Sequence, residues 1–186
     1  MIIENTAVTA VAGLMAIAAR TAPKAKGQDE ILITLLSSAQ KEKLSRAMAD
    51  FGKDNDLGFF VRDAGNIAAC DLCIIIGVRG KVPVGINCGA CGYDSCAAFT
   101  RASRTGKKKS TPFPGPNCAV RMADLGIAVG SAAKTAQIHN VDNRIMYSAG
   151  SIAIALGFMG KECTVAYALP LSVSGKNIFF DRIVAK

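Results

Sequence analysis

Four cysteines in the middle of the chain have the residue type and spacing of an iron–sulfur site. Cys88, Cys91 and Cys96 form a C-x2-C-x4-C pattern, and Cys118 follows from a separate segment. An iron–sulfur cluster needs four thiolates arranged around one small volume. A compact loop would supply three of them and the later segment the fourth. The pattern therefore predicts one cluster, with four irons favoured over two.

The residues between these cysteines suit a loop that wraps around a cluster. Gly89 and Gly92 allow sharp turns, and their peptide N–H groups could point at sulfur. Asp94 or Ser95 can cap a helix that follows, with Cys96 in its first turn. Because the N-terminus of a helix attracts negative charge, this helix would stabilise an anionic cluster.

Other uses of the thiols stay open at this point. Structural zinc also uses four thiolates, usually as two C-x2-C pairs, and cysteines without any ligand are the plainest alternative. Cys70 and Cys73 form a second C-x2-C, which could replace Cys118 or act as a redox dithiol. Since Cys73 lies in an apolar run, where cysteine is often buried, we expect this pair to be structural. Cys163 precedes a predicted strand and is expected in the core.

The string from Asn87 to Cys96, NCGACGYDSC, carries a resemblance to known proteins. Together with the lead-in from Val84, it resembles the small four-cysteine iron–sulfur domain of Rnf-type electron-transport subunits and corrinoid iron–sulfur proteins. The whole chain is similar to a family of bacterial and archaeal proteins described only as containing a ferredoxin domain. The resemblance implies a [4Fe–4S] cluster on the four cysteines above and a role in electron transfer.

The composition indicates one folded domain, residues 1–186, in a reducing compartment. Half of the chain is apolar (51%) and only 19% is charged, so a core can form. The seven cysteines are an odd number, and no basic residue precedes the first apolar stretch, which argues against a secreted disulfide framework. That stretch is shorter than the ~20 residues of a membrane-spanning helix. We therefore expect a cytoplasmic protein with no membrane partner.

The formal net charge of +8 suggests an acidic partner. Nucleic acid is not expected, because the chain has no zinc-finger spacing with histidine and no aromatic RNA-binding motif, and its basic residues are spread out. Arg101, Arg104 and Lys107–Lys109 follow the predicted cluster helix. They are either a solvated face or a docking patch for an acidic electron carrier.

The elements that must position the cysteines alternate between helices and buried strands. We expect helices over residues 6–20, 39–51, 119–137 and 143–156, strands over 31–36, 72–78 and 164–169, and short strands near 57–61 and 177–180. The first strand is apolar on both faces, which predicts a place inside the sheet. Residues 80–118 are instead rich in Gly, Pro, Lys and Cys, which predicts an inserted iron–sulfur module.

Several segments, in this order, resemble flavin-dependent nitroreductases: residues 18–28, 40–44, 148–157 and 165–171. The resemblance implies an α+β fold with a central mixed sheet flanked by helices, a homodimer, and FMN. It implies that the turn after the first helix contacts flavin or its phosphate through Arg20, Lys24, Lys26 and Gln28. The alternative is a basic surface turn.

Three functions are therefore predicted. The first is electron transfer by one [4Fe–4S] cluster, and the second is a flavo-iron–sulfur oxidoreductase that reduces a small substrate. The third is an interaction protein stabilised by structural zinc. His139 is the sole histidine and is expected at a helix end or on the surface. The sequence contains no Ser/His/Asp triad, Walker loop or paired-carboxylate site, so it assigns no catalytic residue.

Overall fold

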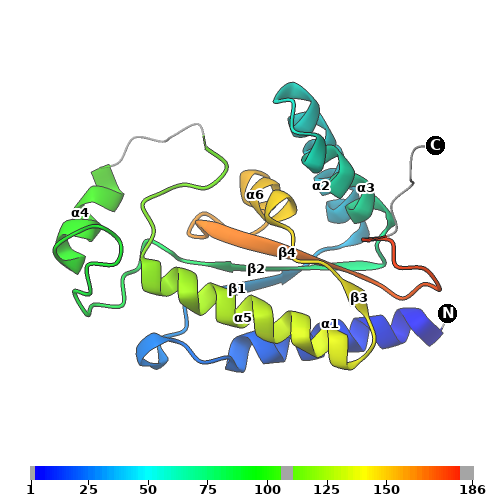
Figure 1. Ribbon diagram of the computed structural model, residues 1–186, viewed down its shortest axis with the longest axis horizontal. Coiled ribbons are helices and arrows are strands. Elements are labelled where there is room, and N and C mark those ends of the chain that lie inside the picture. The colour runs from blue at the N-terminus through cyan, green and yellow to red at the C-terminus, as the bar shows by residue number, and fades with distance from the viewer. Residues whose placement is uncertain (1–2, 106–110, 181–186) are drawn as a thin grey trace.

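A four-stranded antiparallel sheet lies at the centre of the molecule (Figure 1). The computed structural model describes residues 3–105 and 111–180. Strands β2 (Leu72–Val78) and β4 (Val165–Ser172) are the inner pair, and β1 (Ile31–Leu35) and β3 (Asp142–Asn143) are the edges. All of β2 except Leu72 is buried, as expected for a strand with helices on both faces.

Helices cover both faces of the sheet. Helices α1 (Ile3–Thr21) and α5 (Ala119–Ile138) pack on one face, and α2 (Ser38–Asp54), α3 (Gly58–Ala69) and α6 (Tyr147–Ala155) on the other (Figure 1). Because successive side chains of a strand point to opposite faces, β2 serves both layers. Ile74 and Ile76 join the core beneath α1 and α5, whereas Cys73 and Ile75 join the core beneath the other three helices.

Local sequence explains where two of these helices sit. A capping box starts α2: Ser37 Oγ accepts the Gln40 N–H at 3.2 Å, and Gln40 Oε1 accepts the Ser37 N–H at 3.0 Å. Helix α6 lies directly on β4, because Gly150 has no side chain. A Cβ there would stand 2.0 Å from the carbonyl oxygen of Ala166. In α2, the cap at Ser37 places the first helical residue at Ser38, one residue before the predicted start.

Two predicted strands near the N-terminal half need correction. Residues 31–36 were expected inside the sheet, but β1 is an edge strand that pairs with β2 alone among the described strands. Ile31 is buried, the next three residues are half-buried, and Leu35 is exposed, because no second strand covers this edge in the described sheet. Residues 57–61 were expected to be a strand, but they begin α3, whose buried Phe60, Ala64 and Ile67 recur at helical spacing.

Two predictions near the C-terminal half are also wrong. The helix expected from residue 143 begins at Tyr147, because Asp142 and Asn143 pair with β4 as strand β3. Residues 177–180 form a turn and add no strand to the described sheet. The predicted α+β class is confirmed, although every pairing among the described strands is antiparallel, whereas the resemblance implied a mixed sheet.

The segment between β2 and α5 extends beyond one end of the sheet (Figure 1). It contains the cysteine loop (residues 87–95) and helix α4 (Cys96–Thr105). At Cys118 it returns to the body, which is the sheet with the helices on its two faces. Its proposed limits, residues 80–118, remain a prediction. None of the helices in the described ranges is both long enough and apolar enough to cross a membrane.

Candidate metal centre

All four predicted ligands line one cavity, at the junction of the cysteine loop, α4 and the start of α5. Cys88 is exposed, Cys91 and Cys96 are half-buried, and Cys118 is buried. The structure therefore brings together thiols that come from three separate places in the chain.

Apolar side chains form the back of this cavity. Val84, Phe99 and Cys118 make a small buried cluster of their own, with Tyr93 packed against it. The rings of Tyr93 and Phe99 meet edge to face, with centroids 5.8 Å apart. Tyr93 also lines the cavity, where its ring would shield a bound cluster from water.

A tight turn carries Cys91. Gly89 and Gly92 both have a positive φ, 72° and 81°, which favours glycine over other residues. The N–H of Gly92 donates to the carbonyl of Gly89 at 2.8 Å and closes the turn. The expectation that the Gly92 N–H points at a sulfur atom is therefore wrong, since that donor is already used.

Cys96 begins α4 and is held by Asn87. The capping residue is Ser95, whose Oγ accepts the N–H of Ala98 at 3.2 Å. The Cys96 N–H donates to Asn87 Oδ1 at 2.8 Å. The pKa of the Cys96 thiol is lowered, and the largest cause is a backbone hydrogen bond from Asn87. Desolvation acts in the opposite direction, and backbone hydrogen bonds from Gly85 and Ile86 lower the pKa further. The thiolate is the form that binds metal, so this environment favours the ligand state.

Cys118 is fixed to the end of the sheet. It is the N-cap residue of α5, and its N–H donates to the carbonyl of Gly80 at 2.8 Å. Thr164 Oγ1 accepts the Gly80 N–H at 3.0 Å and lies 2.6 Å from Asn117 Oδ1. A Cβ on Gly80 would stand 2.3 Å from Asn117 Oδ1 and 2.6 Å from Thr164 Oγ1. The close approach that places Cys118 therefore requires glycine at position 80.

Two helix N-termini meet the cavity as a result. Cys96 is the first residue of α4, and Cys118 directly precedes α5. Backbone N–H groups at a helix start carry partial positive charge and stabilise anions. Both ends therefore favour thiolates and a negatively charged cluster.

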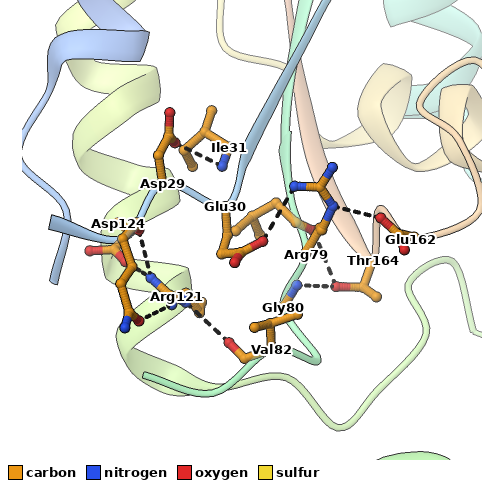
Figure 2. Close-up of polar contacts among 12 residues, drawn as sticks. Asp29, Glu30, Ile31, Arg79, Gly80, Val82, Arg121, Asp124, Glu162 and Thr164 are labelled. Atoms are coloured by element: carbon orange, nitrogen blue, oxygen red, sulfur yellow. Dashed lines mark hydrogen bonds and ion pairs between the residues drawn. The ribbon is translucent and has the colours of Figure 1, made fainter. Parts of the chain in front are cut away.

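A buried ion pair, which sequence reasoning missed, lies one turn into α5 (Figure 2). Arg121 is only 1% exposed and lies 3.1 Å from Asp124. The guanidinium also donates to the carbonyl of Val82 at 3.1 Å and to both oxygens of Gln28 at 2.9 Å. Asp124 accepts the N–H of Ala25 at 2.9 Å. The pair joins the turn after α1 to the segment that leads into the cysteine loop. In the sequence, the feature that could have indicated it is an Arg and an Asp three residues apart in an apolar helix.

The four residues predicted to contact flavin lie around the turn η1 (Ala25–Gly27). The side chains of Arg20, Lys24 and Gln28 form hydrogen bonds within the protein. Arg20 lies 2.6 Å from Asp29 and donates to the carbonyl of Ile31 at 2.8 Å. Lys24 Nζ donates to the carbonyls of Ala19 and Arg20 at the end of α1.

Burial is the largest cause of a lowered pKa for Lys24. Gln28 accepts two hydrogen bonds from Arg121. Lys26 has a left-handed backbone, with φ 55°. The flavin contacts implied by the resemblance remain a prediction.

The other three cysteines lie in the hydrophobic body. Cys70, Cys73 and Cys163 are buried in the core beneath α2, α3 and α6. Burial raises the pKa of Cys70 and of Cys163 to about 11, and it raises that of Cys73 well above its usual range. Cys73 lies near the start of β2, and Gly80 lies two residues beyond its end. At ~3.3 Å per residue, Cys73 is roughly 20 Å from the carbonyl that binds Cys118.

The donor set fits an iron–sulfur cluster in type and number. Within residues 3–105 and 111–180, no three His, Cys, Asp or Glu side chains gather tightly enough to hold a single metal ion. The four thiols instead share the wall of one cavity, as ligands to different irons would. The cavity is small, about 10 Å³, which is room for one water molecule. A cluster therefore needs more room than the thiols leave here, and Cys88 is the most exposed of the four.

Comparison with known proteins identifies the family. Residues 114–182 match the family described as "Uncharacterized protein containing a ferredoxin domain (DUF2148)", and residues 85–111 match one described as "Putative Fe-S cluster". An uncharacterized protein of Archaeoglobus fulgidus is 42% identical over 183 residues, which are 98% of this chain and 96% of the relative. The chain belongs to this ferredoxin-domain family. It is an iron–sulfur protein.

Solved structures share its fold. Nitroreductase A of Vibrio parahaemolyticus has a TM-score of 0.54 at 8% identity, over 95% of this chain and 60% of that one. The NADPH:FMN oxidoreductase of Vibrio harveyi, complexed with NAD+, gives 0.54 at 8% identity, over 90% and 60%. A nitroreductase family protein of Clostridium novyi gives 0.53 at 12%, over 91% and 77%. The chain thus spans about 60% of the first two, and the predicted nitroreductase-like fold is confirmed.

Proposed function

We propose that this protein binds one [4Fe–4S] cluster through Cys88, Cys91, Cys96 and Cys118 and transfers single electrons in the cytoplasm. The observation that carries the proposal is that these four thiols, from separate segments, line one cavity. The match of residues 85–111 to an iron–sulfur family supports it. When bound, such a cluster accepts one electron and later gives up one electron.

The chain's own residues prepare the site for a negatively charged group. The starts of α4 and α5 present partial positive charge beside Cys96 and Cys118. Backbone N–H groups of the cysteine loop favour the Cys96 thiolate. Phe99, Val84 and Tyr93 limit the access of water to the buried side. Hydrogen bonds to sulfur and solvent exclusion are the features by which a protein tunes a cluster potential.

Metal and sulfide analysis of protein purified without oxygen tests this function. We expect about four irons and four acid-labile sulfides per chain, and Cys91→Ser should remove most of both. Cys163→Ala, a change in a buried thiol of the body, should leave the iron content unchanged. Zinc without sulfide, or an unchanged iron content in Cys91→Ser, would contradict the proposal.

We further propose an acidic electron carrier as the partner. Arg104 is exposed near the end of α4, the helix that Cys96 begins, and Lys81 is exposed just before the cysteine loop. Arg101 lies on the same helix, whereas Lys107–Lys109 fall outside the described residues. Attraction between these charges and an acidic surface would steer the encounter, and salt screens such attraction. The reduction rate by ferredoxin should therefore fall as ionic strength rises, and a salt-independent rate would count against this partner.

A second candidate is a flavo-iron–sulfur oxidoreductase, which the nitroreductase-like fold favours. In this case the cluster would feed an FMN that reduces a small substrate, in a homodimer as the resemblance implies. Titration of the protein with FMN, followed by flavin fluorescence, tests it. Lys26→Ala should weaken FMN binding, with exposed Lys134→Ala as a control of equal charge. No FMN binding at micromolar concentration would leave only electron transfer.

A further inference from the structure

A second cavity, of about 460 Å³, lies beside the segment that leads to Cys118. Small-molecule sites are typically ~300–1,000 Å³. Figure 2 shows how three segments meet there: the end of β2, the turn after it, and the turn before β4. The lining residues are Arg79, Lys81, Val82, Pro114, Lys161, Glu162 and Thr164.

The charge of the lining favours one anionic group. Arg79 is already paired, at 2.7 Å from Glu162 and 3.3 Å from Glu30. Lys81 and Lys161 are exposed, and neither forms an ion pair within the part of the chain that the structure describes. Both lysines line the cavity, Lys81 from the turn after β2 and Lys161 from the turn before β4. The cavity therefore carries two ammonium groups that a carboxylate can neutralise.

The remaining walls favour a small apolar body. Val82 is 40% exposed, and Pro114 is half-buried beside it. An exposed aliphatic side chain and a proline ring provide contact area that a flat apolar ligand can cover. Thr164 is buried at the base of the cavity, where its hydroxyl is already hydrogen-bonded.

The base of the cavity is bonded directly to the cluster site. Thr164 Oγ1 contacts Asn117, the residue before Cys118, at 2.6 Å. Gly80 donates to Thr164 Oγ1 at 3.0 Å and accepts the N–H of Cys118 at 2.8 Å. A ligand in this cavity is thus two hydrogen bonds away from a cluster ligand. Its binding does not depend on the cluster, whereas its effect on the cluster rests on the proposed function.

We infer that this cavity binds a small organic carboxylate. Lys81 and Lys161 contact the carboxylate, and Val82 and Pro114 contact its apolar body. The site is separate from the cysteine cavity and from the turn η1.

Equilibrium dialysis with radiolabelled benzoate, on the protein purified without oxygen, tests the inference. Benzoate binds saturably at millimolar concentration, and benzyl alcohol, which lacks the charge, competes poorly. Lys81→Ala and Lys161→Ala each weaken benzoate binding about 5-fold, the upper end of what one exposed ion pair contributes. Lys161→Arg retains most of the affinity. Lys134→Ala, which removes the same charge from an exposed position on α5, leaves binding unchanged.

Three outcomes overturn the inference: no saturable binding of benzoate, unchanged binding in both lysine variants, or an equal loss in Lys134→Ala. The paramagnetic spectrum of the reduced cluster gives an independent measurement, because benzoate beside Thr164 should alter the signal. Cys91→Ser protein should still bind benzoate. That result separates a failure of the carboxylate site from a failure of the cluster proposal.

Discussion

The seven cysteines divide into two groups with opposite surroundings. Those of the iron–sulfur segment lie on a loop and at helix starts, around one cavity. The three of the body, Cys70, Cys73 and Cys163, lie under helices in the core. Backbone hydrogen bonds lower the pKa of Cys96, whereas burial raises that of Cys70 to about 11. The comparison teaches that a place on the wall of a shared cavity, rather than C-x2-C spacing, separates the four candidate ligands from the core cysteines.

The largest expected effect is on iron content. Cys96→Ser should remove most of the iron, because the serine hydroxyl is not a thiolate ligand. Cys73→Ser should keep the iron but lower the free energy of unfolding, because it places a hydroxyl in the core. Iron analysis and chemical denaturation of both variants measure this contrast. Equal iron loss in the two would remove the distinction between the groups.

The next effect concerns the connection between the two regions. Gly80→Ala would drive a methyl group into Asn117 and Thr164, and so displace Cys118. We expect a lower iron content and a loss of about 1–3 kcal/mol in unfolding free energy. Gly126→Ala is the matched control, since a Cβ there meets nothing within 4 Å on α5. Full iron content in Gly80→Ala would show that Cys118 is not held through this contact.

Alkaline pH should lower the free energy of unfolding of the body, because its buried thiols lose their protons. The pKa of Cys70 and Cys163 rises from an ordinary value of 9.0 to about 11 on folding. Their contribution is fully present below pH 9.0 and is lost as the pH rises through about 11. The loss of each contribution lowers the free energy of unfolding by about 2–3 kcal/mol. Denaturation of cluster-free protein between these pH values measures the loss, and Cys163→Ala should flatten part of the slope.

The smallest effect is a difference in thiol reactivity at neutral pH. In cluster-free protein, Cys96 should react with iodoacetamide at a lower pH than an ordinary thiol, because its pKa is lowered. Cys70 and Cys163 should react only after unfolding. Mass spectrometry of the labelled peptides distinguishes them. Faster labelling of Cys163 than of Cys96 would contradict the assignment of their environments.

Local patterns predicted much of the site but less of the sheet. The cap at Ser95 and the position of Cys96 follow from residues next to each other in the chain, and both are confirmed. The apolar run of β1 predicted an inner strand, but strand order depends on contacts between distant segments. The helix α3 was missed because Gly58 disfavours regular structure locally, while packing of Phe60 against α2 and α6 stabilises it.

The sequence by itself determined that this is an iron–sulfur protein and which four thiols are its candidate ligands, in a chain with an apolar core. Thiolate type and short-range spacing are local properties, so they can be recognised without a fold. Only the tertiary structure decided how Cys118 joins the other three, through Gly80 at the end of β2. It also bonded Arg121 to Val82, in the segment that leads into the cysteine loop, and formed a cavity lined by Lys81, Lys161 and Thr164. These features depend on segments that are distant in the chain and meet only when the sheet is complete.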